Sequence, residues 1–179
     1  MRLSKKNVLV FVLLSLAAYM QSPVYAAALS KNYVSARYSY SIKFPADYKI
    51  KISGNKVIFV SPVEDKKLAF SPSVNVVSSE LDKNDTTDLD ALCEKAKNGI
   101  IKGWGNAEFI EQKKEKLNGF EVYRFVSTSK QQKANFKLMQ VLLLNNKKIY
   151  VLTYTALESQ YNGQLGVARA IIGSFKITK

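Results

Sequence analysis

The sequence contains no histidine and only one cysteine, Cys93. Histidine is the commonest general base and the commonest metal ligand, so its absence argues against most acid–base enzymes and metal sites. A single cysteine cannot form an intramolecular disulfide, and the fold must therefore be held together by its apolar core. We expect Cys93 itself to be buried in that core, because it lies on the apolar side of a predicted helix and has no histidine to activate its thiol.

Residues 1–28 have the three-part organisation of a secretory signal peptide. A start with three basic residues precedes an almost unbroken apolar run over residues 7–20, and small residues follow. This run is shorter than the roughly 20 apolar residues that a membrane-spanning helix needs. We therefore predict cleavage near Ala26 or Ala28, which leaves residues 29–179 as one extracytoplasmic domain, secreted or periplasmic, without a stable membrane span. The alternative is a retained membrane anchor.

The formal net charge is +13, from 27 basic and 14 acidic residues. An excess of this size favours anionic partners. Export argues against nucleic acid, so the expected partner is an envelope protein or an anionic surface, such as phospholipid head groups or cell-wall polymer. The alternative is a lysine-rich surface that has no partner at all, and the sequence leaves the oligomeric state open.

Two kinds of periodicity divide the domain. Apolar residues spaced three and four apart predict helices over residues 89–102 and 158–172, whereas residues 29–39 look like a polar lead-in. Alternating apolar residues and turn signals predict strands over residues 38–44, 48–52, 56–60, 68–78, 107–116, 120–129, 135–144, 148–156 and 174–177. Some of these strands are apolar on both faces and need cover on both. The sequence therefore predicts an α+β fold, an α/β/α sandwich whose central, mainly antiparallel β-sheet has helices on both faces.

Motifs for catalysis are scarce. Ser127 and Lys130 have the Ser-x-x-Lys spacing of some hydrolases, but the companion motifs are missing. The acidic loop from Asp82 to Asp90 offers oxygen ligands for a weak calcium site, although it lacks the EF-hand pattern and helix capping explains most of its acids. We predict no catalytic residues, no cofactor and no metal site.

Basic residues on and between the predicted hairpin strands of residues 107–144 are the main candidates for partner binding. Antiparallel pairing of neighbouring strands can gather several of them, with an aromatic side chain, into one patch. The predicted partner-binding residues are Lys113, Lys114, Lys116, Tyr123, Arg124, Lys130, Lys133 and Lys137. The alternative is that these lysines only protect exposed strand ends and edges from pairing.

Three places in the chain carry a family resemblance. They are residues 40–45, then Ser61-Pro62 with residues 74–77, and finally residues 150–156 with Tyr161 and residues 171–175. Together they resemble the PsbP-like superfamily of small secreted domains, which includes bacterial DcrB-type proteins and the extrinsic proteins of photosystem II. The resemblance extends over residues 38–178. It implies the same α/β/α sandwich and a non-enzymatic role, and it carries over no catalytic residues.

The expected function is thus that of an exported, non-enzymatic binding or accessory protein of the bacterial cell envelope. Many bacterial members of the family look like lipoproteins, but this chain has no lipid-accepting cysteine near the cleavage site. A lipid tether is therefore not expected. The alternatives are a protein that binds an anionic membrane surface or a cell-wall polymer and, least favoured, a histidine-free hydrolase.

Overall fold

The computed structural model describes residues 29–104, 107–131 and 134–178 of the chain. The predicted signal peptide and Lys133 lie outside these residues. In chain order the elements are β1 (Lys31–Ser35), β2 (Tyr40–Phe44), β3 (Lys49–Ser53), β4 (Lys56–Val60), β5 (Ser73–Glu80), α1 (Leu89–Trp104), β6 (Glu108–Leu117), β7 (Phe120–Gln131), β8 (Ala134–Asn145), β9 (Lys148–Leu157), α2 (Glu158–Gly173) and β10 (Lys176–Ile177).

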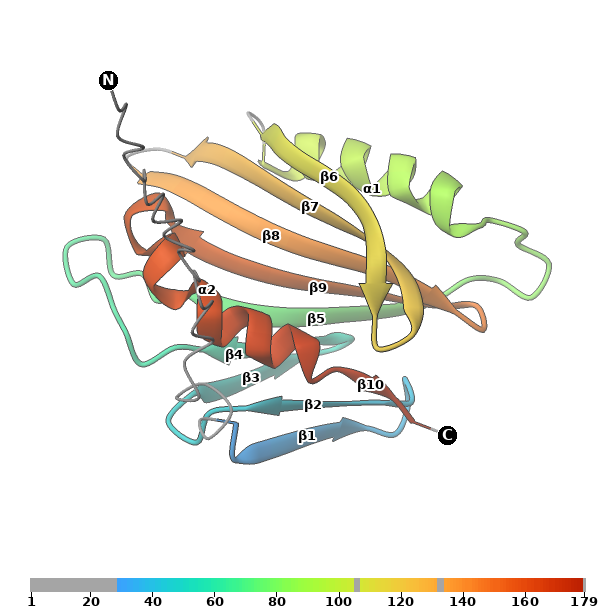
Figure 1. Cartoon of the computed structure of the whole chain (residues 1–179), viewed down its shortest axis with the longest axis horizontal. Helices are drawn as coiled ribbons and strands as arrows, with labels where there is room; N and C mark the ends of the chain where they lie inside the picture. The colour runs from blue at the N-terminus through green and yellow to red at the C-terminus, as the bar shows by residue number, and fades with distance from the viewer. Residues whose placement is uncertain (1–28, 105–106, 132–133, 179) are drawn as a thin grey trace, which may run out of the picture.

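A seven-stranded antiparallel sheet dominates the molecule (Figure 1). Its strand order is β3-β4-β5-β9-β8-β7-β6, and the long strands β6 to β9 follow one another as hairpins. Asn118 and Gly119 connect β6 to β7 with φ angles of 50° and 91°, and Asn146 and Lys147 occupy the same kind of turn between β8 and β9. Two consecutive positive φ angles give the turn the twist that a tight hairpin needs, which confirms both predicted turns.

The two faces of this sheet pack against different helices. Along β8, Met139, Val141 and Leu143 belong to the larger core, which also holds buried residues of α2. The alternate residue Leu142 belongs to a smaller core with Leu92 and Cys93 of α1. Because successive side chains of a strand point to opposite faces, we call these the α2 face and the α1 face. Figure 1 shows α2 in front of the sheet and α1 behind it.

A second, three-stranded sheet also covers the α2 face. Its order is β1-β2-β10, and the β2 side chains Tyr40, Ile42 and Phe44 are buried in the larger core. The interpretation of residues 29–39 as a lead-in was therefore wrong, because β1 pairs with β2 along its whole length. Only Ser35 of β1 is buried, so this strand lacks the apolar alternation by which strands are recognised in a sequence.

Cover on the α1 face is incomplete. Helix α1 carries the chain from β5 to the far edge strand β6 and packs over β7 and β8, through Phe125 and Leu142. Over β4 and β5 the same face is only half-buried, as at Ile58 and Asn75. The α+β class and the large antiparallel sheet are confirmed, but the molecule is mostly sheet, and neither face carries a complete helical layer.

Helix α1 begins one residue after its N-cap. The Asp88 carboxylate accepts a hydrogen bond from the Ala91 backbone N–H at 2.8 Å, so Asp88 is the N-cap of α1. Cys93 is buried as predicted, with 1% of its surface exposed. Neither described helix is long and apolar enough to cross a membrane.

Candidate functional site

The eight residues predicted to bind a partner do not share one face of the sheet. Strand register pairs Lys113 with Arg124 and Lys114 with Tyr123, and these two pairs are successive. Alternation then places Lys113, Arg124, Lys130 and Lys137 on the α2 face, and Lys114, Lys116 and Tyr123 on the α1 face. Lys133 lies outside the described residues. The predicted set is therefore divided by the sheet itself, and its role in partner binding stays a prediction.

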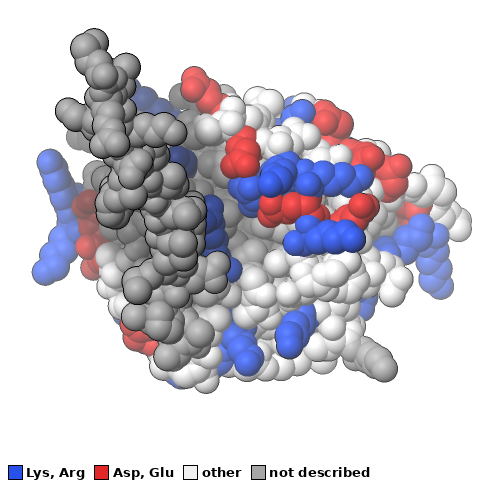
Figure 2. Space-filling view, viewed as in Figure 1, with Lys and Arg blue, Asp and Glu red and all other residues white. Residues whose placement is uncertain are grey.

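The Arg124 side chain makes three hydrogen bonds to glutamates on the neighbouring strand β6. Its Nη1 and Nη2 atoms donate to Glu111 at 3.0 and 2.9 Å, and its Nε donates to Glu115 at 3.0 Å. These bonds raise the pKa of Arg124 and lower that of Glu111. Figure 2 shows the result, with basic and acidic side chains interleaved over the region of β6 and β7. Such a surface is neutralised locally, and it ties neighbouring strands together.

Two other members of the set connect the sheet to the helices. Lys114 Nζ and the Tyr123 hydroxyl donate to the Asp90 carboxylate of α1, at 3.0 and 2.9 Å. Lys137 Nζ lies 4.8 Å from the centre of the Tyr161 ring in α2, which is a cation–π distance. These contacts give both lysines a structural role in holding the helices onto the sheet.

The acidic loop between β5 and α1 is also used internally. Asp85 accepts a hydrogen bond from the Thr87 backbone N–H at 2.8 Å, Asp88 caps α1, and Asp90 binds the two sheet residues just described. Within the described ranges, no three histidine, cysteine, aspartate or glutamate side chains come close enough to hold a metal ion.

Ser127 and Lys130 do not form a catalytic pair. A spacing of three along strand β7 sends their side chains to opposite faces of the sheet. Ser127 is also 1% exposed, which keeps its hydroxyl away from any substrate in solution. The same spacing brings side chains together only on a helix.

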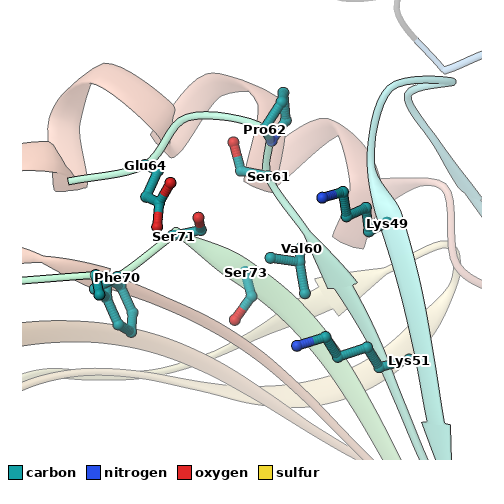
Figure 3. A pocket seen from close by; sticks show the side chains of 10 residues that line it. Lys49, Lys51, Val60, Ser61, Pro62, Glu64, Phe70, Ser71 and Ser73 are labelled. Atoms are coloured by element: carbon teal, nitrogen blue, oxygen red, sulfur yellow. The ribbon is translucent and has the colours of Figure 1, made fainter. Parts of the chain in front are cut away.

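A pocket of about 420 Å³ lies on the part of the α1 face that α1 leaves uncovered. Strands β3, β4 and β5 form its floor, and the loop over residues 61–72 forms its wall. Its polar groups are the side chains of Lys49, Lys51, Ser61, Glu64, Ser71 and Ser73. We call it the lysine pocket. In Figure 3, both lysines extend from β3 toward the serines, and Glu64 stands across from them beside Ser71.

Strand register sets the floor of the lysine pocket. Lys49 pairs with Val60 of β4, and Val60 pairs in turn with Ser73 of β5. Paired residues of antiparallel strands lie on the same face, so these three side chains form one row. Lys51 follows two residues after Lys49 and therefore joins them on that face. Two ammonium groups are thus placed side by side by the period of the strand alone.

The loop that forms the wall is held in place by its own hydrogen bonds. The backbones of Asp65 and Phe70 bond to each other in both directions, at 2.8 and 3.2 Å. The Asp65 carboxylate also accepts the backbone N–H groups of Lys67 and Leu68, at 3.0 and 2.9 Å. The Phe70 ring then packs edge-on against Phe136 of β8, with 5.0 Å between ring centres. The wall is therefore fixed before any ligand arrives.

The chemistry of the lysine pocket suits an anionic group. Among the described residues, neither Lys49 nor Lys51 takes part in an ion pair, unlike Lys114 and Arg124. Serine hydroxyls beside the two ammonium groups can donate further hydrogen bonds to a carboxylate or a phosphate. An N–H or O–H group elsewhere in such a ligand can donate a hydrogen bond to the Glu64 carboxylate. Sequence reasoning treated both lysines only as the polar positions of a strand, although their alternation already placed them on one face.

Comparisons with known proteins give the family and the fold. The model of the PsbP family matches residues 28–177, whereas no curated protein matches the sequence significantly. Cyanobacterial PsbP (CyanoP) from Synechocystis sp. PCC 6803 superimposes with a TM-score of 0.62 and 13% identity, over 84% of this chain and 93% of that one. LpqN, involved in cell envelope biogenesis of Mycobacterium tuberculosis, gives 0.60 and 15%, over 78% and 83%. The Ran-binding protein Mog1p of Saccharomyces cerevisiae gives 0.55 and 11%, over 83% and 95%.

Proposed function

The chain belongs to the PsbP family, and from this premise we propose that it is an exported, non-enzymatic binding protein of the cell envelope. In this proposal residues 1–28 are a cleaved signal peptide, and residues 29–179 form one domain that binds an acidic segment of a partner protein. The family match begins at residue 28, which supports that boundary. LpqN, described as involved in cell envelope biogenesis, and Mog1p, described as Ran-binding, have similar folds and support a binding role.

One observation carries the proposal, namely the pair of ammonium groups in the lysine pocket. Lys49 and Lys51 lie on one face, next to serine hydroxyls and a preformed loop. Four of the eight residues first predicted to bind a partner are occupied by ion pairs, hydrogen bonds or a cation–π contact inside the fold. A partner that carries carboxylates gains most where positive charge is not already neutralised.

A protein partner is favoured because the wall of the lysine pocket exposes apolar side chains. The loop over residues 61–72 exposes two large apolar residues, Val63 and Leu68. Ile50 and Ile52 of β3 are exposed as well, but they alternate with the pocket lysines and therefore lie on the opposite face of the strand. Protein interfaces combine apolar contacts of this kind with a few charged groups, whereas a simple ion needs only the charges. A segment with acidic and apolar residues therefore fits the region best.

The test uses a fluorescein-labelled hexaglutamate peptide and measures its binding by anisotropy at low and high salt. Replacing both pocket lysines, as Lys49→Ala/Lys51→Ala, is expected to weaken binding about 10-fold, because two charge contacts of surface strength are lost. The matched control is Lys113→Ala/Lys116→Ala, which removes the same net charge from β6. Both of these lysines belong to the set that the sequence analysis predicted to bind a partner. The control is expected to bind almost like the unmodified protein.

Three outcomes overturn the proposal. Equal weakening in both double variants shows that only the net charge of the protein matters. Binding that does not decline at high salt is not carried by the lysines. Failure to bind the peptide, together with binding to vesicles of phosphatidylglycerol but not of phosphatidylcholine, assigns the function to an anionic membrane surface instead.

A further inference from the structure

A second cavity, of about 270 Å³, lies between helix α1 and the sheet. It is on the same face as the lysine pocket, but it lies over β7, β8 and β9 and not over the β3 edge of the sheet. Its sheet side is mainly apolar and includes Phe125 and Leu142. Phe125 is part of a small aromatic group, with the Phe109 and Tyr123 rings 5.9 and 6.2 Å away. We call this space the α1 cavity.

The α1 cavity exists because two positions of the helix carry no side chain. Gly99 and Gly103 are four residues apart, so they lie on the same side of α1, and both line the cavity. A Cβ atom placed on either glycine would have no neighbour within 4 Å. Close packing therefore does not require glycine at either position, although glycine weakens a helix. The missing side chains leave open a space that an ordinary residue would fill.

One polar group faces the α1 cavity with part of its hydrogen-bonding capacity unused. The Gln140 side chain lines the cavity, and its Nε2 donates to the Thr153 hydroxyl at 3.3 Å. Its Oε1 is buried and has no hydrogen-bond partner within the described part of the chain. Leaving a buried acceptor unpaired costs free energy, which a ligand with a matching donor recovers.

We propose that the α1 cavity binds a small, mainly apolar molecule that donates one hydrogen bond to Gln140 Oε1. The volume is close to the lower end of the range for small-molecule sites, and the combination of an aromatic floor with one polar group is typical of them. Such a ligand is the size of a bicyclic aromatic compound with an N–H or O–H group. This site is independent of the lysine pocket, since the two share no lining residue.

The first arm of the test compares indole with benzofuran, two bicyclic compounds of equal size of which only indole has an N–H donor. Binding is measured by isothermal titration calorimetry on the whole protein. Indole is expected to bind about 10-fold more tightly than benzofuran, because one hydrogen bond to a buried acceptor contributes free energy of about that size to the affinity. Gln140→Met removes the acceptor at nearly constant length, and it is expected to bring indole down to the affinity of benzofuran.

The second arm fills the α1 cavity. Gly99→Leu places a side chain in the open space and is expected to abolish indole binding. Gly163→Leu is the matched control, because Gly163 lies in α2, outside the α1 cavity, and a Cβ there also has no neighbour within 4 Å. Thermal unfolding of both variants shows whether they fold. A folded Gly99→Leu variant that still binds indole, a Gln140→Met variant that still distinguishes the two compounds, or no indole binding by the unmodified protein would overturn the proposal.

Discussion

Asn118 provides the sharpest test of how the fold is held together. It lies in the tight turn between β6 and β7 with a φ of 50°. Its Nδ2 donates to the backbone carbonyls of Gly173 and Phe175, at 2.9 and 2.6 Å, where α2 ends and the chain continues into β10. The residue therefore has two roles, because it adopts a left-handed backbone and it fastens the hairpin to the C-terminal segment. We expect Asn118→Ala to lose both.

The size of the effect follows from these two roles. Asn118 is exposed, so each hydrogen bond belongs at the low end of the usual range, about 0.5 kcal/mol, or about 1 kcal/mol for the pair. A left-handed backbone costs alanine roughly a further 1 kcal/mol. The free energy of unfolding should therefore fall by about 2 kcal/mol, which lowers the Tm of a domain of this size by roughly 4–8 °C.

The assay is equilibrium unfolding in guanidinium chloride, followed by circular dichroism. Asn118→Gly is the control that separates the two roles, because glycine adopts the left-handed backbone but cannot make the side-chain hydrogen bonds. It should lose only about 1 kcal/mol. An Asn118→Ala variant as stable as the unmodified protein would refute the assigned hydrogen bonds. An equal loss in both variants would refute the backbone contribution.

Two further predictions concern α1. Hydrogen bonds from Lys114 and Tyr123 lower the pKa of Asp90 below its ordinary value of 3.8, so its stabilising contribution is complete above about pH 5 and is lost as the pH falls through the lower, folded-state pKa. Unfolding free energies measured across acidic pH should thus decline less in Asp90→Asn, and identical declines would contradict this. Burial raises the pKa of the Cys93 thiol, so Ellman's reagent should label it about 100-fold more slowly in the native protein than in denaturant. Equal rates would show that the thiol is accessible.

Much of the fold could be predicted from short-range patterns in the sequence. The apolar spacing around Leu92 and Cys93 indicated a helix, and α1 covers Leu89–Trp104. The asparagine-containing turns indicated the hairpins that join β6 to β7 and β8 to β9. These signals are reliable because helix periodicity and turn geometry depend on residues that are neighbours in the chain.

Elements stabilised by distant partners were harder to predict. Strand β1 is mostly exposed and forms because β2 offers it a hydrogen-bonding edge, not because its own sequence alternates. Helix α1 gives a second example, since Ile101 is apolar and lies within the predicted helix but is 45% exposed, whereas its neighbour Ile100 is buried. Successive residues of a helix point in different directions, so the packing of α1 on the sheet decides which of the two is covered.

The sequence by itself determined the net positive charge, the single buried cysteine, the class of fold and the resemblance to PsbP-like domains. Each of these depends on composition or on local pattern. Only the tertiary structure decided which charges are neutralised and which are available. Ion pairs occupied Lys114 and Arg124, and the loop over residues 61–72 folded beside β3 to complete the lysine pocket. Those contacts join residues far apart in the chain, and no local pattern specifies them.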